Sequence, residues 1–202
     1  MARPTTTTAT TTTSQAVLGL LALRSWTTYE LAKQVQRSLG WFWPRAERKL
    51  YDEPKRLEAA GLAKSSAEMT GARPKTVYTI TASGRKALRR WLSEPPEPPV
   101  LEFEGLVKVF FADGGSLDQM QATLREIAAT SDARLAELEE KVQQNEAPDV
   151  RFPERRAINQ VALHFQVEHE RTIGGWARWA LDQVNGWNSP TDPGTWVYGH
   201  TS

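Results

Sequence analysis

Apolar residues recur at helical spacing in the first third of the chain, and this pattern predicts a series of short helices. Residues 16–23 are almost all apolar and predict a buried helix. Thr27 and Thr28 offer an N-cap for a second helix, which runs to about residue 39 and is closed by Gly40. The second helix is amphipathic, and its apolar face consists of Leu31, Ala32, Val35 and Leu39.

A third helix is expected over residues 44–60, because Pro44 suits a first helical position and Gly61 suits a helix end. Pro54 interrupts this pattern, since it has no N–H to donate to the carbonyl of Leu50. It should therefore kink the helix or start a new segment. The residues expected to point inward are Leu50, Leu57 and Ala60.

Two short strands are expected at residues 62–68 and 76–80, because the Gly and Pro between them fit a turn over residues 69–75. Thr81 then caps a fourth helix, which ends near residue 93. This order of elements is typical of a winged helix-turn-helix, in which a helix is followed by two strands joined by a basic turn and then by a further helix. The sequence therefore predicts such a DNA-binding domain over residues 16–93.

The second half of the chain predicts a separate, all-helical domain over residues 101–185. Residues 94–100 are rich in proline and predict a stiff linker before it. A short apolar helix comes first, and Ser116 with Gln119 then forms the capping box of a long helix. Pro153 starts a last helix of about 30 residues, while residues 186–202 have no helical period and predict an irregular tail.

The apolar positions of the two long helices form narrow seams, which are typical of helices that pack on other helices. Two long helices and one short one are too few to enclose a stable core by themselves. We therefore expect them to pair with those of a second copy, as a dimerisation domain. The alternative is an intramolecular bundle packed against the winged domain. The seams consist of Leu117, Met120, Leu124, Ile127, Leu135, Leu138 and Val142, and of Ile158, Val161, Phe165, Thr172, Ile173, Trp176 and Ala180.

Charge divides the chain in the same way. Residues 1–93 hold 16 Lys and Arg against 6 Asp and Glu, whereas residues 94–202 hold 9 against 18. The halves therefore carry about +10 and −9, although the whole chain carries only +1. This separation indicates that only the first half binds a polyanion. Residues 1–15 are dominated by threonine and are expected to be a disordered tail.

Several classes of function are disfavoured by composition and spacing. The chain has no cysteine and no apolar run near the roughly 20 residues that cross a bilayer, so we expect a cytoplasmic protein without a membrane partner. His164 and His169 lie five residues apart, whereas metal-binding pairs on a helix lie three or four apart. His164 is more simply paired with Glu168, one turn away. We expect no metal, no cofactor and no enzymatic activity.

The DNA contacts are expected on the outward face of the third helix, above all at its N-terminal end, and at the tip of the hairpin. Positive side chains near a helix N-terminus add to the helix dipole there, which favours phosphate. Basic residues at a hairpin tip reach a phosphate or the minor groove. The candidates are Arg45, Arg48, Lys49, Tyr51 and Lys55 on the third helix and Arg73 and Lys75 on the hairpin.

These segments together resemble the PadR family of transcriptional regulators. The resemblance is carried by Thr28-Tyr29-Glu30-Leu31, Leu50-Tyr51, Lys55-Arg56-Leu57-Glu58-Ala59-Ala60-Gly61-Leu62 and Val77-Tyr78-Thr79-Ile80-Thr81-Ala82-Ser83-Gly84-Arg85. It implies a winged helix-turn-helix, a helical dimerisation domain, operator DNA as partner and repression that a small molecule relieves. It also adds Thr28 and Tyr29 to the expected DNA contacts. The commoner family pattern has proline directly after the tyrosine, whereas Asp52-Glu53-Pro54 follows Tyr51 here.

Two questions stay open at this point. Trp41, Trp43, Trp176 and Trp179 are candidates to line an apolar pocket between subunits for a flat aromatic effector, but helix packing explains them equally well. A winged fold can also serve as a protein-interaction adaptor that does not bind specific DNA. The basic charge of the first half argues against such an adaptor. Because a homodimer places two winged domains on one two-fold axis, a palindromic operator is the expected DNA partner.

Overall fold

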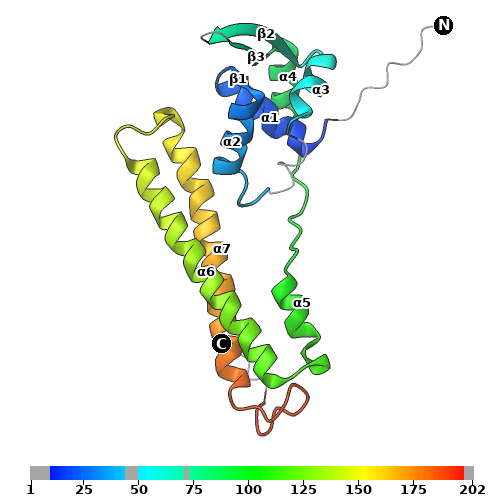
Figure 1. Ribbon diagram of the computed structural model, residues 1–202, viewed down its shortest axis with the longest axis vertical. Helices are drawn as coiled ribbons and strands as arrows, with labels where there is room; N and C mark the ends of the chain where they lie inside the picture. The colour runs from blue at the N-terminus through cyan, green and yellow to red at the C-terminus, as the bar shows by residue number, and fades with distance from the viewer. Residues whose placement is uncertain (1–9, 44–49, 71–72, 198–202) are drawn as a thin grey trace, which may run out of the picture. The chain divides into compact units, whose positions relative to one another are not determined.

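The computed structural model describes residues 10–43, 50–70 and 73–197, and Figure 1 shows their arrangement. The chain divides into two compact units, Met1–Pro98 and Pro99–Ser202. The first unit combines short helices with a small sheet, and the described part of the second unit is helical apart from a C-terminal turn. Within the described ranges, every helix is too short or too polar to cross a membrane.

The first unit is a winged helix-turn-helix, as predicted. Its three-stranded antiparallel sheet has the order β1-β3-β2. Trp26 in β1 is fully buried, and its indole N–H donates to the carbonyl of Leu20 at 2.7 Å, so the buried polar atom is satisfied. The elements are α1 (Thr12–Leu23), β1 (Trp26–Thr27), α2 (Thr28–Ser38), α3 (Glu53–Ala59), β2 (Ala63–Thr70), β3 (Arg73–Ile80) and α4 (Ala82–Leu92).

Helix α1 begins at Thr12, inside the segment that the sequence predicts to be disordered. Thr11 caps the helix, and the Thr11 and Ser14 side chains each bond the other residue's backbone N–H. Thr13, Ser14 and Gln15 are buried. The prediction of disorder is therefore wrong for residues 12–15, because polar threonine and serine contribute caps and buried hydrogen bonds here rather than an apolar face.

Helix α2 follows the sequence prediction closely. Thr27 is its N-cap and forms a capping box with Glu30. Leu31 and Val35 are fully buried, and the N–H of Gly40 donates to the carbonyl of Val35 beyond the last turn. The predicted amphipathic face is confirmed at these two buried positions.

Helix α3 is shorter than predicted, because the described helix covers only Glu53–Ala59. Pro54 lies in its first turn, so this proline starts a new segment instead of kinking a long helix. Gly61 has a positive φ of 70°, and the N–H of Leu62 donates to the carbonyl of Leu57 across it. Leu50 and Leu57 are buried as predicted, but Ala60 is exposed, because it follows the last helical residue.

The hairpin of β2 and β3 is longer than predicted. Its strands pair from Ala63 with Ile80 out to Thr70 with Arg73, so residues 69, 70 and 73–75 belong to strands and not to a turn. Pro74 is compatible with this strand, because β1 pairs only with Val77 and Tyr78 and leaves an open edge beside the proline. The predicted tip residues therefore lie on an extended wing.

The second unit is built on two long antiparallel helices, α6 (Leu117–Glu146) and α7 (Arg156–Val184), with the short α5 (Glu104–Phe110) before them (Figure 1). Short 3-10 turns, Ala112–Gly114 and Pro153–Arg155, precede the two long helices. The predicted Ser116 and Gln119 capping box of α6 is confirmed. The α6 seam is confirmed as well, with Leu124, Ile127 and Leu138 buried.

The single seam predicted on α7 is wrong, because its residues lie on two different faces. Ala180 is buried and Ile173 and Trp176 are half-buried, whereas Ile158, Val161, Phe165 and Thr172 are exposed. The residues that form the buried face of α7 are more polar and smaller than those that the sequence predicts for it. It consists of Gln166, Val167, Glu170, Gly174, Ala177, Ala180 and Val184.

Polar contacts fix how α7 lies against α6. The hydroxyl of Ser131 donates to the backbone carbonyl of buried Glu170 at 2.6 Å, and Arg134 pairs with the Glu170 carboxylate at 3.2 Å. Gly174 allows the close approach, since a Cβ there would lie 3.0 Å from the Ser131 hydroxyl. A carboxylate buried between helices needs these donors, so the contact specifies one register for the pair.

The C-terminal tail folds back on the end of α7. The indole N–H of Trp196 donates to the Gln183 side chain at 2.7 Å, and the ring of Trp196 lies 5.5 Å from that of Trp187. Trp187 packs against a core cluster that contains Leu124 and Val184. The described tail is irregular, as predicted, and it is held by these tryptophans.

The capping box of α2 generates a stability prediction. The backbone N–H of Thr27, aided by the Thr27 hydroxyl and Arg24, lowers the pKa of Glu30 below its ordinary value of 4.5. Thr27→Ala should destabilise the first unit by about 1 kcal/mol, measured by urea unfolding, whereas the neighbouring Thr28→Ala should have less effect.

The same cap predicts a dependence of stability on pH. The stabilisation from ionised Glu30 is complete above pH 4.5 and is lost as the pH falls through its lowered pKa. The stability difference between the parent protein and Glu30→Gln should therefore shrink on acidification. A difference that grew would contradict this account.

Candidate nucleic-acid interface

The exposed start of α2 places an aromatic ring and a cation together. Tyr29 is 61% exposed, and the ammonium group of Lys33 lies 4.6 Å from the centre of its ring. Thr28 beside it is half-buried. Leu31 and Val35 anchor the opposite face of the helix in the core. Lys33 is a candidate that the sequence prediction missed, although its position four residues after Tyr29 on an amphipathic helix was the signal.

The segment around α3 exposes Tyr51 and Lys55 as predicted. Tyr51 is 62% exposed, and Lys55 is exposed one turn later. Glu53 lies between them in sequence but is only 1% exposed, so its negative charge does not face solvent beside them. Asp52 is exposed and is the one acidic side chain of residues 50–56 that lies on the surface. The buried anchors Pro54 and Leu57 hold this arrangement.

The wing contributes Lys75, which is exposed, together with Arg73 as the first residue of β3. Glu68 is the strand partner of Lys75 across the hairpin, so a carboxylate and an ammonium group share one face of the wing. Lys64, exposed near the base of β2, is a further cation that the sequence prediction missed. It lies four residues before Glu68 on the same strand, and the period of two places both on one face.

Arg45, Arg48 and Lys49 lie outside the described residues. The remaining predicted contacts lie on α2, on α3 or just before it, and on the wing, the elements with which winged domains bind DNA. Exposed ammonium groups and tyrosine hydroxyls can bond phosphate oxygens or base edges. The arrangement is suited to binding a polyanion.

The four tryptophans considered for an effector have different surroundings. Trp43 is half-buried and donates its indole N–H to the hydroxyl of Thr13, and Trp41 is also half-buried. Both belong to the first unit. In the second unit, Trp176 packs on the core and meets Phe103 edge to face at 6.0 Å, whereas Trp179 is 39% exposed.

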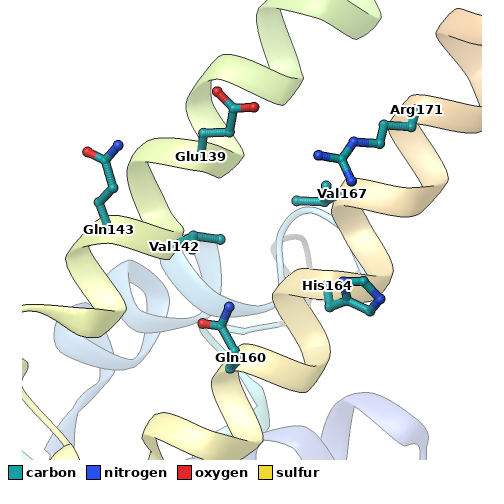
Figure 2. A pocket seen from close by; sticks show the side chains of 7 residues that line it. All are labelled: Glu139, Val142, Gln143, Gln160, His164, Val167 and Arg171. Atoms are coloured by element: carbon teal, nitrogen blue, oxygen red, sulfur yellow. The ribbon is translucent and has the colours of Figure 1, made fainter.

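A cavity of about 340 Å³ lies between α6 and α7 (Figure 2). Val142 from α6 and Val167 from α7 point toward each other across it. His164 and Arg171 bring nitrogen donors to its α7 side. The lining, which includes none of the four tryptophans, is Glu139, Val142, Gln143, Gln160, His164, Val167 and Arg171.

The two histidines of α7 have separate surroundings. Glu168 pairs with Arg171 at 2.7 Å, so the prediction that Glu168 pairs with His164 is wrong. The ring of His169 stacks on that of Phe165 at 6.0 Å. In the part of the chain that the structure describes, no cluster of three or more His, Cys, Asp or Glu side chains is arranged to hold a metal ion.

Two family models match the chain, one over each unit. Residues 17–90 match the transcriptional regulator PadR-like family, and residues 104–185 match the C-terminal domain of virulence activator alpha. A probable transcriptional regulator of Mycobacterium tuberculosis is 34% identical over 84 residues, which are 41% of this chain and 44% of that relative. The negative transcriptional regulator PadR of Bacillus subtilis is 25% identical over 175 residues, which are 84% of this chain and 96% of that protein.

Solved structures of that Bacillus subtilis protein share the fold. Its complex with operator DNA has a TM-score of 0.73 and 22% sequence identity, and covers 85% of this chain and 98% of that one. Its complex with p-coumaric acid has a TM-score of 0.70 and 24% identity over the same shares of the two chains. At this identity the likeness shows a common fold of both units.

The wing generates a test of the candidate interface. Lys75→Ala should weaken binding to any duplex DNA, and the slope of log affinity against log salt should fall by about 1 for each bound subunit, because each subunit loses one phosphate contact. Glu68→Gln should strengthen binding, since it removes a carboxylate beside Lys75. Fluorescence anisotropy with a labelled duplex measures both effects. Glu154→Gln, an exposed change in the second unit, is the charge-matched control. An unchanged salt slope for Lys75→Ala would remove the wing from the interface.

Proposed function

Because the chain belongs to the PadR-like family of transcriptional regulators, we propose that it binds operator DNA as a homodimer and represses the genes beside its operator. The family consists of regulators and not of enzymes. The observation that carries the proposal is the exposure of Tyr29, Tyr51, Lys55 and Lys75, which the basic unit presents on α2, on and just before α3, and on the wing. We place the protein in the cytoplasm, because its proposed partner is DNA.

In this proposal α3 and the residues before it enter the major groove, and the wing contacts the neighbouring backbone. Arg45, Arg48, Lys49, Tyr51 and Lys55 are proposed contacts of the recognition segment. Thr28 and Tyr29 contact DNA from the start of α2, and Arg73 and Lys75 from the wing. Base-edge contacts give specificity, whereas phosphate contacts give affinity that depends on salt.

The proposed dimer is supported by apolar side chains that the second unit leaves exposed. Val161 is 75% exposed and Phe165 is 63% exposed on the face of α7 that turns away from α6. Phe110 is 77% exposed and Phe111 is 64% exposed at the end of α5. Exposed apolar surface is unfavourable by about 25 cal/mol per Å², so burying these two groups of side chains against a second copy favours association. A two-fold symmetric dimer presents two winged units to two half-sites, which makes a palindromic operator the expected target.

We further propose that a small aromatic molecule releases the protein from DNA. The support is the p-coumaric acid complex of the Bacillus subtilis protein and the presence of Trp41, Trp43, Trp176 and Trp179 in this chain. Indole rings stack on flat ligands and offer an N–H for hydrogen bonding. The exposed ring of Trp179 is the accessible member of the pair on α7.

Sequencing the genomic fragments that the protein retains tests the function. The expected result is a small set of fragments that share an inverted repeat and whose retention falls steeply as salt rises. Aromatic acids are then added to the complex, and release of the fragment with a change in tryptophan fluorescence is expected. Retention without a shared sequence, or with no dependence on salt, would favour the alternative function of a protein-interaction adaptor.

The dimer prediction is tested by a charge on the exposed face of α7. Phe165→Glu should convert a particle of twice the chain mass into one of the chain mass in sedimentation velocity at micromolar concentration. The reason is that a carboxylate would then lie in an apolar interface. Thr130→Glu, on an exposed position of α6, is the matched control and should remain dimeric. A parent protein that sediments as one chain would refute the dimer.

A further inference from the structure

Glu53 is a carboxylate buried inside the first unit, and its surroundings are specific. It is 1% exposed and lies in the first turn of α3. One carboxylate oxygen accepts a 2.5 Å hydrogen bond from the Ser14 hydroxyl of α1, and the other accepts one from the Arg56 guanidinium at 3.1 Å. A buried carboxylate is tolerated only with such donors, so Glu53 ties α3 to the first turn of α1.

The Ser14 hydroxyl is oriented toward Glu53 by the cap of α1. Ser14 has a single hydroxyl proton, which it donates in the hydrogen bond to the Glu53 carboxylate. The backbone N–H of Thr11 donates to the Ser14 oxygen, and the Thr11 hydroxyl, 3.0 Å away, is left to donate to that oxygen as well. The cap therefore orders Thr11, Ser14 and Glu53 into one chain of hydrogen bonds, each strengthened by the charge at its end.

The residue next to Ser14 makes a second contact with the same region of the chain. The buried Thr13 hydroxyl accepts the indole N–H of Trp43 at 3.3 Å. Trp43 and Glu53 lie ten positions apart in sequence, on either side of Leu50 and Tyr51. Neighbouring residues of α1 thus bond the chain on both sides of Tyr51, and the second bond lies two residues before Lys55.

Stability alone is a weak reason for burying the Glu53 carboxylate, which pairs with Arg56 and accepts a hydrogen bond from Ser14. Replacing a buried ion pair by apolar side chains of similar size is often neutral or stabilising. What the Ser14–Glu53 contact adds is a defined position for the first turn of α3. Exposed Lys55 lies in that turn, and exposed Tyr51 lies two residues before Glu53, just ahead of the helix. The contact fixes the direction in which these two side chains leave the surface.

We propose that Ser14 and Glu53 are positioning residues for DNA recognition: the first turn of α1 holds α3 at the orientation in which Tyr51 and Lys55 meet their operator. This proposal rests on the proposed function, since it assigns a role within DNA binding. In this proposal the threonine-rich start of α1 contributes to DNA recognition by positioning α3, without contacting DNA itself. Specific binding depends on this orientation, whereas non-specific attraction to phosphate does not.

The experiment compares Ser14→Ala with the parent full-length chain. Affinity is measured by anisotropy for a genomic fragment that the parent retains and for a shuffled duplex. We expect specific affinity to fall about five- to tenfold, the equivalent of one typical net hydrogen bond, while affinity for the shuffled duplex stays the same. Hydrogen exchange of the DNA-free protein should rise at residues 50–57 more than in β2 and β3, because the hydrogen bond that holds α3 is lost.

Ser38→Ala is the matched control, because the Ser38 hydroxyl donates to the carbonyl of Gln34 within its own helix α2 and not to α3. It should leave both the affinity ratio and the exchange of residues 50–57 unchanged. Glu53→Gln is the second variant should Ser14→Ala fail to fold, since it keeps the size of the side chain and loses the charge. It should lower the affinity ratio in the same direction.

The outcomes separate this inference from the proposed function. An unchanged ratio of specific to non-specific affinity in a folded Ser14→Ala protein overturns the positioning role, and so does an equal fall in Ser38→Ala. A parent protein that shows no preference for any genomic fragment refutes the proposed function. In that case the hydrogen exchange decides whether Ser14 holds α3: faster exchange at residues 50–57 supports the contact, and unchanged exchange overturns it.

Discussion

A carboxylate leaves water only where hydrogen-bond donors replace the water molecules it loses, and much of the first unit depends on how this condition is met at Glu53. The donors come from Ser14 on α1 and from Arg56 one turn along α3. Helix α1 must therefore extend to Thr12, and α3 must begin where Glu53 and Pro54 turn inward. The same condition applies in the second unit, where Ser131 and Arg134 meet the buried carboxylate of Glu170. Among the residues that the structure describes, each unit thus has one buried acid that specifies how two helices meet.

Local rules allowed a large part of the fold to be predicted from the sequence. The capping boxes at Thr27 and Ser116 involve residues three apart, and so their spacing is visible in the chain. The helix end at Gly61 and the apolar face of Leu31 and Val35 are equally local signals. Burial of Ser14 was not predictable, because its partner Glu53 lies 39 residues away and no apolar period marks the site. The length of the wing was missed because strand register depends on pairing and not on composition.

In the candidate site and the exposed helix faces, too, local patterns could be predicted and long-range contacts could not. Tyr51, Lys55 and Lys75 are polar or amphipathic residues beside buried anchors, and their exposure follows from helix and strand periods. On α7, Phe165 and Ala180 recur at helical spacing with Ile158 and Trp176, yet they lie on two faces. The spacing predicts a helix but cannot assign a partner to each face, because apolar residues are favoured both against α6 and in a subunit interface. Ala60 was expected to be buried for a related reason: the pattern identifies an apolar residue, while the place where the helix ends decides its exposure.

The pairing of Glu68 with Lys75 on the wing has a consequence for how quickly a regulator finds its target. Non-specific DNA outnumbers an operator by many orders of magnitude, and the time spent on each wrong site grows with the phosphates that are neutralised there. An acidic neighbour on the wing shortens that time, because it offsets part of the attraction of Lys75 for the backbone. A regulator with such a wing visits more sites per second along a chromosome, and it depends on contacts to base edges to stop at the correct one.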